Sequence, residues 1–149
     1  MADTELTQAE SDRLHAMQKV PADDLAHNFP GLAGVLTVPL VSRDRTESFC
    51  LDVRRGRLDL AKVTLQNRAR QVVVLVRLDL GGPPHRNPDD TVIPCPHLHL
   101  YREGYADKWA FAVPPDRFTD LTDRWQVLLD FMEFCNVVER PRINRELFA

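Results

Sequence analysis

The stretch QVVVLVRLDL, residues 71–80, has the strongest strand pattern in the sequence. It contains an unbroken apolar run from Val72 to Val76, followed by two charged residues, Arg77 and Asp79, with one residue between them. Valine is enriched in β-strands, and a continuous apolar run is typical of a strand that is covered on both faces. The stretch therefore predicts a central strand, with Arg77 and Asp79 on one face near its end.

Similar strand patterns lie on both sides of this stretch. They are GVLTVPLV (34–41), SFCLDV (48–53) and RLDLAKVTLQ (57–66) before it, and HLHLY (97–101) and KWAFAV (108–113) after it. The first joints, SRDRTE, RRG and NRAR, are short and polar. Because a parallel pair needs a long crossover, short joints indicate antiparallel neighbours. We expect an antiparallel, strongly curved sheet of about six strands.

Helical patterns are found near both ends of the chain. Residues 4–19 predict a helix capped by Thr4 or Thr7, and apolar residues spaced three and four apart predict a helix over 114–140 that begins at PPD. The chain thus reads as one α+β domain, 1–149, in which an N-terminal and a C-terminal helix flank the sheet. Its parts are a helix and connection (1–30), the sheet with a His/Pro-rich loop at 81–97 (31–113), the C-terminal helix (114–140) and a tail (141–149).

Composition narrows the class of protein. A net charge of -3 argues against a nucleic-acid binder driven by overall charge. Three cysteines form no paired framework, which is typical of a reducing compartment. The polar N-terminus lacks the apolar core of a signal peptide, and no apolar run is long enough to span a membrane. We expect a cytoplasmic protein with no membrane contact.

The chemistry-bearing residues concentrate between Pro83 and Trp109, which includes three of the five histidines and both tyrosines. If HLHLY is extended, His97, His99 and Tyr101 share one face. Arg77 and Asp79 precede the loop that carries His85. We therefore expect the side chains of Arg77, Asp79, His85, His97 and His99 to converge at one end of the sheet. The convergence is a hypothesis drawn from spacing.

Three interpretations of this segment remain open. In the first, His97 and His99 bind zinc, with Cys95 or His85 as the third ligand. In the second, the histidines only hydrogen-bond backbone groups in a proline-rich loop, and the protein is a non-enzymatic phage or bacterial interaction protein.

In the third interpretation, which we rank first, the site is a metal-independent ribonuclease. His97 and His99 share the acid–base work, Arg77 stabilises phosphate charge, and Asp79 or His85 orients them. Tyr101, Tyr105 and Arg86 are the candidate substrate-binding residues, since a nucleic-acid base stacks on aromatic rings. Arginines 54, 55, 57, 68 and 70 form a predicted basic rim.

The combined motif resembles a known pattern. Arg-x-Asp (77–79), His-x-Asn-Pro-Asp (85–89), Pro-His-x-His-x-Tyr (96–101), Glu-Gly-Tyr and Lys-Trp-Ala (103–110) are similar to an uncharacterised bacterial and prophage-associated domain family. The resemblance covers about residues 48–114. The order of Arg77, Asp79, His85, Pro96, His97 and His99 also resembles toxins of one small toxin–antitoxin class, although a single histidine stands before Leu98 where that class has two.

The resemblance implies a compact, growth-inhibiting effector directed at RNA. The leading prediction is therefore a toxin-like cytoplasmic ribonuclease without a cofactor, with RNA and a cognate antitoxin or host protein as partners. The alternative is a zinc-binding module or hydrolase that uses His97, His99 and Cys95.

Overall fold

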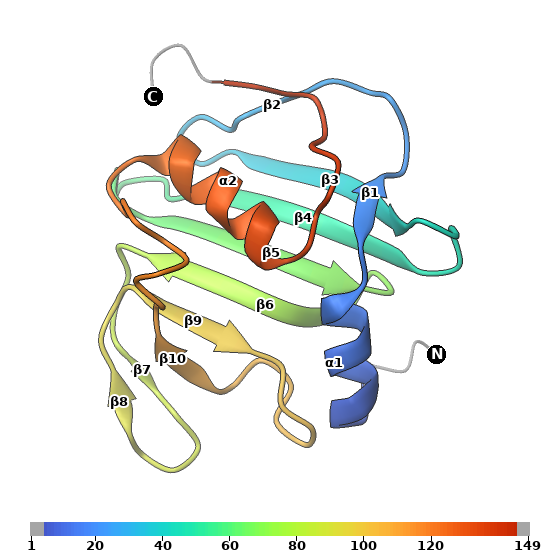
Figure 1. The fold of residues 1–149 in the computed structure, drawn as a ribbon. Coiled ribbons are helices and arrows are strands. Elements are labelled where there is room, and N and C mark those ends of the chain that lie inside the picture. Colours follow the sequence, from blue (N-terminus) through green and yellow to red (C-terminus); the bar gives the residue numbers. More distant parts are fainter. Residues whose placement is uncertain (1–4, 146–149) are drawn as a thin grey trace.

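The structure is a computed structural model that describes residues 5–145, and its main feature is a seven-stranded antiparallel sheet (Figure 1). The strand order is β1-β3-β4-β5-β6-β9-β10. The strands are β1 (Lys19–Pro21), β3 (Val35–Ser42), β4 (Ser48–Arg55), β5 (Val63–Ala69), β6 (Val73–Leu80), β9 (His97–Leu100) and β10 (Ala110–Ala112). Strands β3 to β6 follow one another in sequence and in space, as their short joints predict.

The predicted antiparallel sheet is confirmed, and the strand count is corrected from six to seven. The missed strand, β1, has only three residues and includes a proline, so it shows no alternating pattern. The strand predicted over 57–66 begins only at Val63. Residues 57–62 form a loop, which is closed by a hydrogen bond from the Gly56 N–H to the Lys62 carbonyl oxygen. Leu58 in this loop is 93% exposed.

The apolar run in β6 has a different cause from the one predicted. Strand β6 has a β-bulge against β5. Asn67 pairs with Val76 and the next residue, Arg68, pairs with Val74, so Leu75 is an extra residue in β6. Val74 is only half-buried and Val72 is exposed, so this strand is not covered on both faces along its length. Beyond the bulge, Arg77 and Asp79 share one face as predicted.

Two helices have well-defined caps. Helix α1 (Gln8–Ala16) begins after Thr7, which forms a capping box with Glu10. Helix α2 (Arg124–Phe134) begins after Asp123, whose carboxylate accepts hydrogen bonds from two backbone N–H groups. The predicted start of the C-terminal helix at residue 114 is wrong, because the chain forms turns until this cap. The other proposed cap, Thr4, lies outside the described residues.

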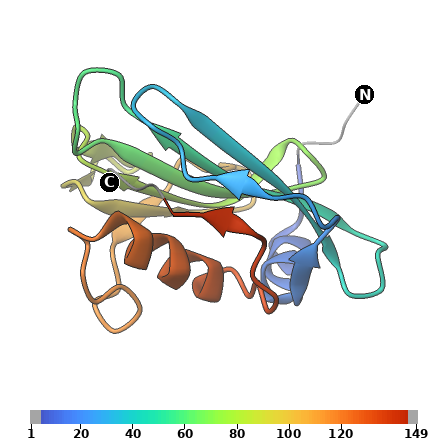
Figure 2. The same ribbon diagram turned by 90° about the horizontal axis from the view of Figure 1, so that it is seen from above.

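Both helices pack on the same face of the sheet rather than on its two sides (Figure 2). This face buries the apolar core, which includes Leu14 from α1, Leu128 and Phe131 from α2, and Leu51 and Leu78 from the strands. Because side chains alternate along a strand, the residues between these core positions face the opposite side. That opposite side carries polar and charged side chains.

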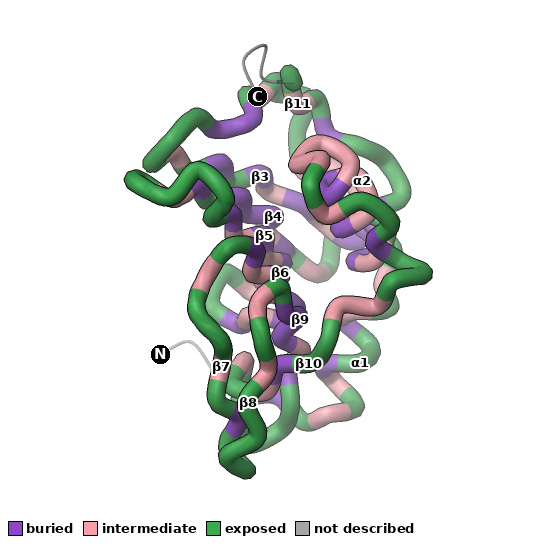
Figure 3. The backbone as a smooth tube through the Cα atoms, turned by 90° about the vertical axis from the view of Figure 1, so that its left-hand side faces the viewer, coloured by how far each residue is buried: buried purple, intermediate pink, exposed green. Residues whose placement is uncertain are grey.

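Two short pairings complete the structure. Strand β2 (His27–Asn28) pairs in parallel with β11 (Ile143–Asn144), so part of the predicted tail is ordered against the N-terminal connection. Within the predicted 81–97 loop, β7 (His85–Arg86) and β8 (Val92–Ile93) form a hairpin beside β9 and β10 (Figure 3). Among the described residues, no helix is long and apolar enough to cross a membrane.

Candidate functional site

Two rows of polar side chains cross the open face of the sheet from β4 to β9. Strand register aligns them, since each residue is the direct partner of the next. One row is Arg54, Thr64, Asp79 and His97, and the other is Asp52, Gln66, Arg77 and His99. Adjacent strands lie about 4.8 Å apart, so neighbouring side chains within a row are in reach of one another.

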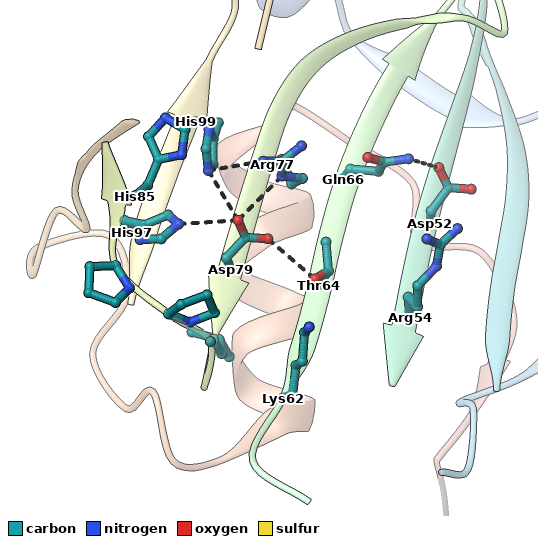
Figure 4. A pocket seen from close by; sticks show the side chains of 14 residues that line it. Asp52, Arg54, Lys62, Thr64, Gln66, Arg77, Asp79, His85, His97 and His99 are labelled. Atoms are coloured by element: carbon teal, nitrogen blue, oxygen red, sulfur yellow. Dashed lines mark hydrogen bonds and ion pairs between the residues drawn. The ribbon is translucent and has the colours of Figure 1, made fainter. Parts of the chain in front are cut away.

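Asp79 is the centre of this arrangement (Figure 4). Its Oδ2 atom lies 3.0 Å from His99 Nε2, 3.2 Å from His97 Nε2 and 3.3 Å from Arg77 Nε. Its other oxygen, Oδ1, accepts a hydrogen bond from the Thr64 hydroxyl at 3.2 Å. One carboxylate oxygen is therefore the shared contact of two imidazoles and a guanidinium.

The environment fixes the charge of the carboxylate. Burial alone would raise the pKa of Asp79, but the hydrogen bond from His99 and the positive charge of Arg77 outweigh it and lower that pKa to about 2. Burial and the neighbouring His99 lower the pKa of His97, against the charge of Asp79, which raises it. The site thus combines an ionised carboxylate with an imidazole that resists protonation.

His99 is the most constrained of these side chains, with 1% of its surface exposed. Its Nδ1 lies 2.8 Å from the Asp107 carbonyl oxygen, which can only accept, so Nδ1 carries a proton. Its Nε2 is 3.1 Å from Arg77 Nη2, a donor, and 3.0 Å from Asp79 Oδ2, an acceptor. Nε2 cannot accept from Arg77 and donate to Asp79 at once.

Arg77 is anchored from the far side by the Asp107 carboxylate, whose Oδ2 lies 2.6 Å from Nη1. Asp107 thus holds two site residues, Arg77 through its side chain and His99 through its backbone. The remaining nitrogen of His97, Nδ1, is buried and has no hydrogen-bond partner among the described residues.

His85 reaches the cluster from the β7–β8 hairpin. Its ring centroid lies 4.6 Å from that of His99 and 5.8 Å from that of His97. Its Nε2 lies 2.7 Å from the Lys108 carbonyl oxygen, so Nε2 carries the proton and Nδ1 has the lone pair. The side chain of Asn87 holds the hairpin in place by pairing with both backbone groups of Ala110, at 2.8 and 3.0 Å.

A second polar group lies at the β4 end of the rows. Asp52 receives two hydrogen bonds from Arg68, at 2.6 and 3.0 Å, and one each from Gln66 and Thr37, both at 2.8 Å. Burial would raise the pKa of Asp52, but these hydrogen bonds outweigh it and the pKa lies below its ordinary value. The carboxylate is fully paired and serves to hold neighbouring strands together.

A cleft of about 340 Å³ joins the two groups. The rows form its floor, and His85 lies beside His97 and His99 at one end (Figure 4). Pro83 and Pro84 also line the cleft. Its charged lining residues are Asp52, Arg54, Lys62, Arg77 and Asp79. The cleft is large enough for a small ligand.

The structure brings five of the predicted site residues together, namely Arg77, Asp79, His85, His97 and His99. The others lie elsewhere. Tyr101 follows the end of β9, and its hydroxyl bonds the backbone N–H and carbonyl of Leu6 at 2.7 and 2.8 Å. Tyr105 packs against Trp109 on the surface, and Arg86 is exposed beside Asp90. These three side chains do not line the cleft and so lie apart from the other predicted site residues.

Two further expectations are corrected. The thiol of Cys95 lies 3.4 Å from the Asp79 carbonyl oxygen and accepts a hydrogen bond from Gly82 N–H, so it does not join the histidines. The residue that groups with His97 and His99 is Asp79. The basic rim is not a unit either, because only Arg54 of its members lines the cleft. Arg68 and Arg70 pair with carboxylates, and Arg55 is buried.

Sequence reasoning missed three contributors, Asp107, Thr64 and Lys62. Lys62, just before β5, and Thr64 within it could have been found from the sequence, since both alternate with the buried Val63 and Leu65. Asp107 lies in the turn between β9 and β10, and no pattern in the sequence places it beside Arg77.

A family model matches residues 6–137, well beyond the 48–114 segment that carries the sequence motif. Searches of the curated proteins and of the solved structures find no match. The expectation of an uncharacterised domain family is confirmed, whereas the likeness to toxins remains a prediction. The chain belongs to a family of unknown function, DUF6978.

Proposed function

We propose that the protein is a small hydrolase whose reaction centre is a divalent metal ion, with zinc as the preferred ion, bound by Asp79, His97 and His99. The observation that carries the proposal is the convergence of the three donor atoms, one from each residue, which all lie within 4.8 Å of one another. Two imidazoles and one carboxylate, with a further position open, is a recurrent donor set for catalytic zinc.

The two separations between Asp79 and the histidine donor atoms fit a metal ion. Bonds of 2.0–2.2 Å place neighbouring ligands roughly 3.3 Å apart in a tetrahedron and roughly 2.9 Å apart in an octahedron. Asp79 Oδ2 lies 3.0 and 3.2 Å from the two Nε2 atoms, between these values. The third separation, between the donor atoms of His97 and His99, is within 4.8 Å.

The orientation of His99 supports the same assignment. Metal-bound histidines usually donate their second N–H to a carbonyl or carboxylate, which fixes the ring and leaves a lone pair for the metal. His99 donates Nδ1–H to the Asp107 carbonyl in this way. A cation bound at Asp79 would replace the contacts of Nε2 with Asp79 and Arg77 and would be bound by the Nε2 lone pair.

The surrounding residues suit hydrolysis. A bound zinc ion supplies a Lewis acid and lowers the pKa of a bound water molecule. Arg77, held by Asp107 at 2.6 Å, keeps that anchor when Nε2 of His99 binds an ion and presents positive charge to a substrate oxyanion. His85 packs against the rings of His97 and His99 at the same end of the cleft.

A metal-independent ribonuclease is the second candidate, and the position of Arg77 favours it. This guanidinium contacts both Asp79 and His99, so the cluster also forms an ion-pair network without a metal. In that case His97 and His99 exchange protons with RNA and Arg77 stabilises the phosphorus centre. Against it, His99 is nearly fully buried and both its nitrogens have protein partners.

The biological role is proposed from the resemblance alone. A toxin-like protein stops growth when expressed, and a cognate antitoxin restores it. A non-enzymatic interaction protein, which is the third alternative, instead tolerates loss of both His97 and His99 and copurifies with a host partner. Growth after induction of wild type and of the His97→Ala/His99→Ala variant separates these roles.

The deciding experiment measures zinc, iron and manganese by elemental analysis of freshly purified protein and after chelation and reloading. Wild type is expected to bind about one equivalent of zinc. Asp79→Asn and His97→Ala/His99→Ala are expected to lose it, while His27→Ala, which changes a histidine on β2, retains it. Hydrolysis of a phosphodiester reporter by the reloaded protein then tests the reaction.

Absence of stoichiometric metal in wild type after reloading would overturn the metal proposal. Cleavage of RNA by the chelated protein, lost in His97→Ala/His99→Ala, would replace it with the metal-independent site. Stoichiometric iron instead of zinc would keep the ligands and change the chemistry from hydrolysis to oxidation.

A further inference from the structure

We propose that Arg54 and Lys62 bind the phosphate group of a small phosphate ester at the end of the cleft away from the histidines. The inference rests on the proposed function, because it names the substrate class of the same site. It assigns a binding role to two side chains that line the cleft and lie outside the proposed metal ligands.

Position is the first reason. Arg54 lies in the same row as Asp79, separated from it by Thr64 on β5, which places the two backbones about 10 Å apart. Lys62 precedes β5 and lies on the same face as Thr64. Both cationic side chains line the cleft and lie to one side of the Asp79 cluster (Figure 4). A ligand that contacts them therefore extends toward the donor atoms of the proposed metal site.

Charge is the second reason. The two carboxylates in the cleft already have cationic partners, since Asp52 pairs with Arg68 and Asp79 with Arg77. Arg54 and Lys62, in contrast, make no side-chain hydrogen bond or ion pair within residues 5–145. They are the unneutralised charges of the lining, and a divalent ion at Asp79 adds to the positive potential. Such a cleft attracts an anion.

The chemistry of the two groups selects phosphate over carboxylate. A guanidinium binds phosphate through two parallel hydrogen bonds, and an ammonium adds a point charge to a third oxygen. Gln66 and Thr64 on the floor offer further polar contacts. The volume of about 340 Å³ suits a ligand of nucleotide size rather than a long polymer in one site.

The experiment uses phenylphosphonate, which resembles a phosphate ester and does not hydrolyse, with benzoate as its carboxylate counterpart. Binding is measured by calorimetry at low and physiological salt, on chelated and on zinc-loaded protein. The variants are Arg54→Gln/Lys62→Gln and, as the matched control, Arg57→Gln, which removes an exposed arginine from the neighbouring loop outside the cleft lining.

We expect phenylphosphonate to bind wild type and Arg57→Gln alike, more tightly than benzoate, and to bind Arg54→Gln/Lys62→Gln about tenfold or more weakly, which corresponds to removal of charge-assisted contacts. Zinc content is expected to be unchanged in the double variant. Arg54→Lys is expected to recover part of the affinity.

The two proposals fail in different ways. Normal zinc content with equal phenylphosphonate affinity in the double variant and wild type overturns the phosphate site and leaves the metal site intact. Binding that depends on Arg54 and Lys62, in protein that takes up no zinc even after reloading, supports the phosphate site and overturns the metal site. Tight binding of single-stranded RNA with no measurable binding of phenylphosphonate overturns the small-ester proposal in favour of RNA.

Discussion

The Nε2 atom of His99 lies 3.0 Å from Oδ2 of Asp79, while Nδ1 of the same ring donates to the Asp107 carbonyl at 2.8 Å. This relationship favours the proposed metal site over proton exchange with a substrate, because both nitrogens of His99 already contact protein oxygens. The proposal that Asp79, His97 and His99 hold a cation rests on the same convergence of donor atoms.

Zinc is expected to stabilise the folded protein. An ion that binds only the native state contributes about 4 kcal/mol when its free concentration is 1,000 times Kd, which raises the Tm of a domain of this size by about 10 °C. Differential scanning calorimetry with and without chelator measures the shift. In His99→Ala the Tm is expected to be the same under both conditions, and an equal rise in that variant would contradict the assigned ligands.

Asn87 is expected to be the main attachment of the His85 hairpin. Its side chain bonds both backbone groups of Ala110, and both residues are buried. Asn87→Ala leaves a buried N–H and a buried carbonyl unpaired, which costs about 2 to 3 kcal/mol. Urea unfolding measures this loss. The control is Asp89→Ala in the exposed tip of the hairpin, where an equal loss would show that any change in the turn has the same effect.

The strands were predictable where their side chains alternate and their turns are short. Strand β4 and the HLHL segment fall where the sequence places them, and so does the shared face of Arg77 and Asp79. Strand β1 was not predictable, because three residues contain no period and their pairing depends on β3. Helix α2 starts late because Asp123 caps it. The sequence offers a second start signal at the prolines of PPD, 114–116, and alternation does not distinguish the two.

The part of the site that depends on side-chain alternation and strand pairing was predictable. Spacing alone places His97 beside His99 and Arg77 beside Asp79, and antiparallel pairing then joins the two strands. The position of Tyr101 was not predictable, because β9 ends at Leu100 and the following residue leaves the alternation. Contributions from turns, such as Asp107, depend on long-range packing and have no local signal.

Tyr101 is expected to be structural. Its hydroxyl donates to the Leu6 carbonyl and accepts from the Leu6 N–H, both buried contacts that attach the segment before α1 to the sheet. Tyr101→Phe is expected to cost about 1 to 2 kcal/mol of stability and to speed hydrogen exchange at the Leu6 amide. Zinc content and phenylphosphonate affinity are expected to remain at wild-type values. A selective loss of ligand affinity would instead restore this residue to the binding site.

His15 is expected to make the fold sensitive to acid. Burial, with a smaller contribution from the positive charges of Lys19 and Arg117, lowers the pKa of His15 from 6.5 to about 4, and Asp12 only partly opposes this. Below pH 6.5 the His15 imidazole is therefore protonated in the unfolded chain, whereas in the folded chain it stays neutral down to about pH 4. The contribution of neutral His15 to the free energy of unfolding is fully present above pH 6.5 and is lost as the pH falls toward 4.

The loss is on the order of 2 kcal/mol, less than the full pKa change implies because the ring keeps some contact with water. Urea unfolding at pH 7, 5.5 and 4.5 measures it in wild type and in His15→Gln, where the same carboxylates titrate and only this imidazole is missing. The variant is expected to lose less stability than wild type across that interval. Parallel curves for the two proteins would show that the acid sensitivity arises from other groups.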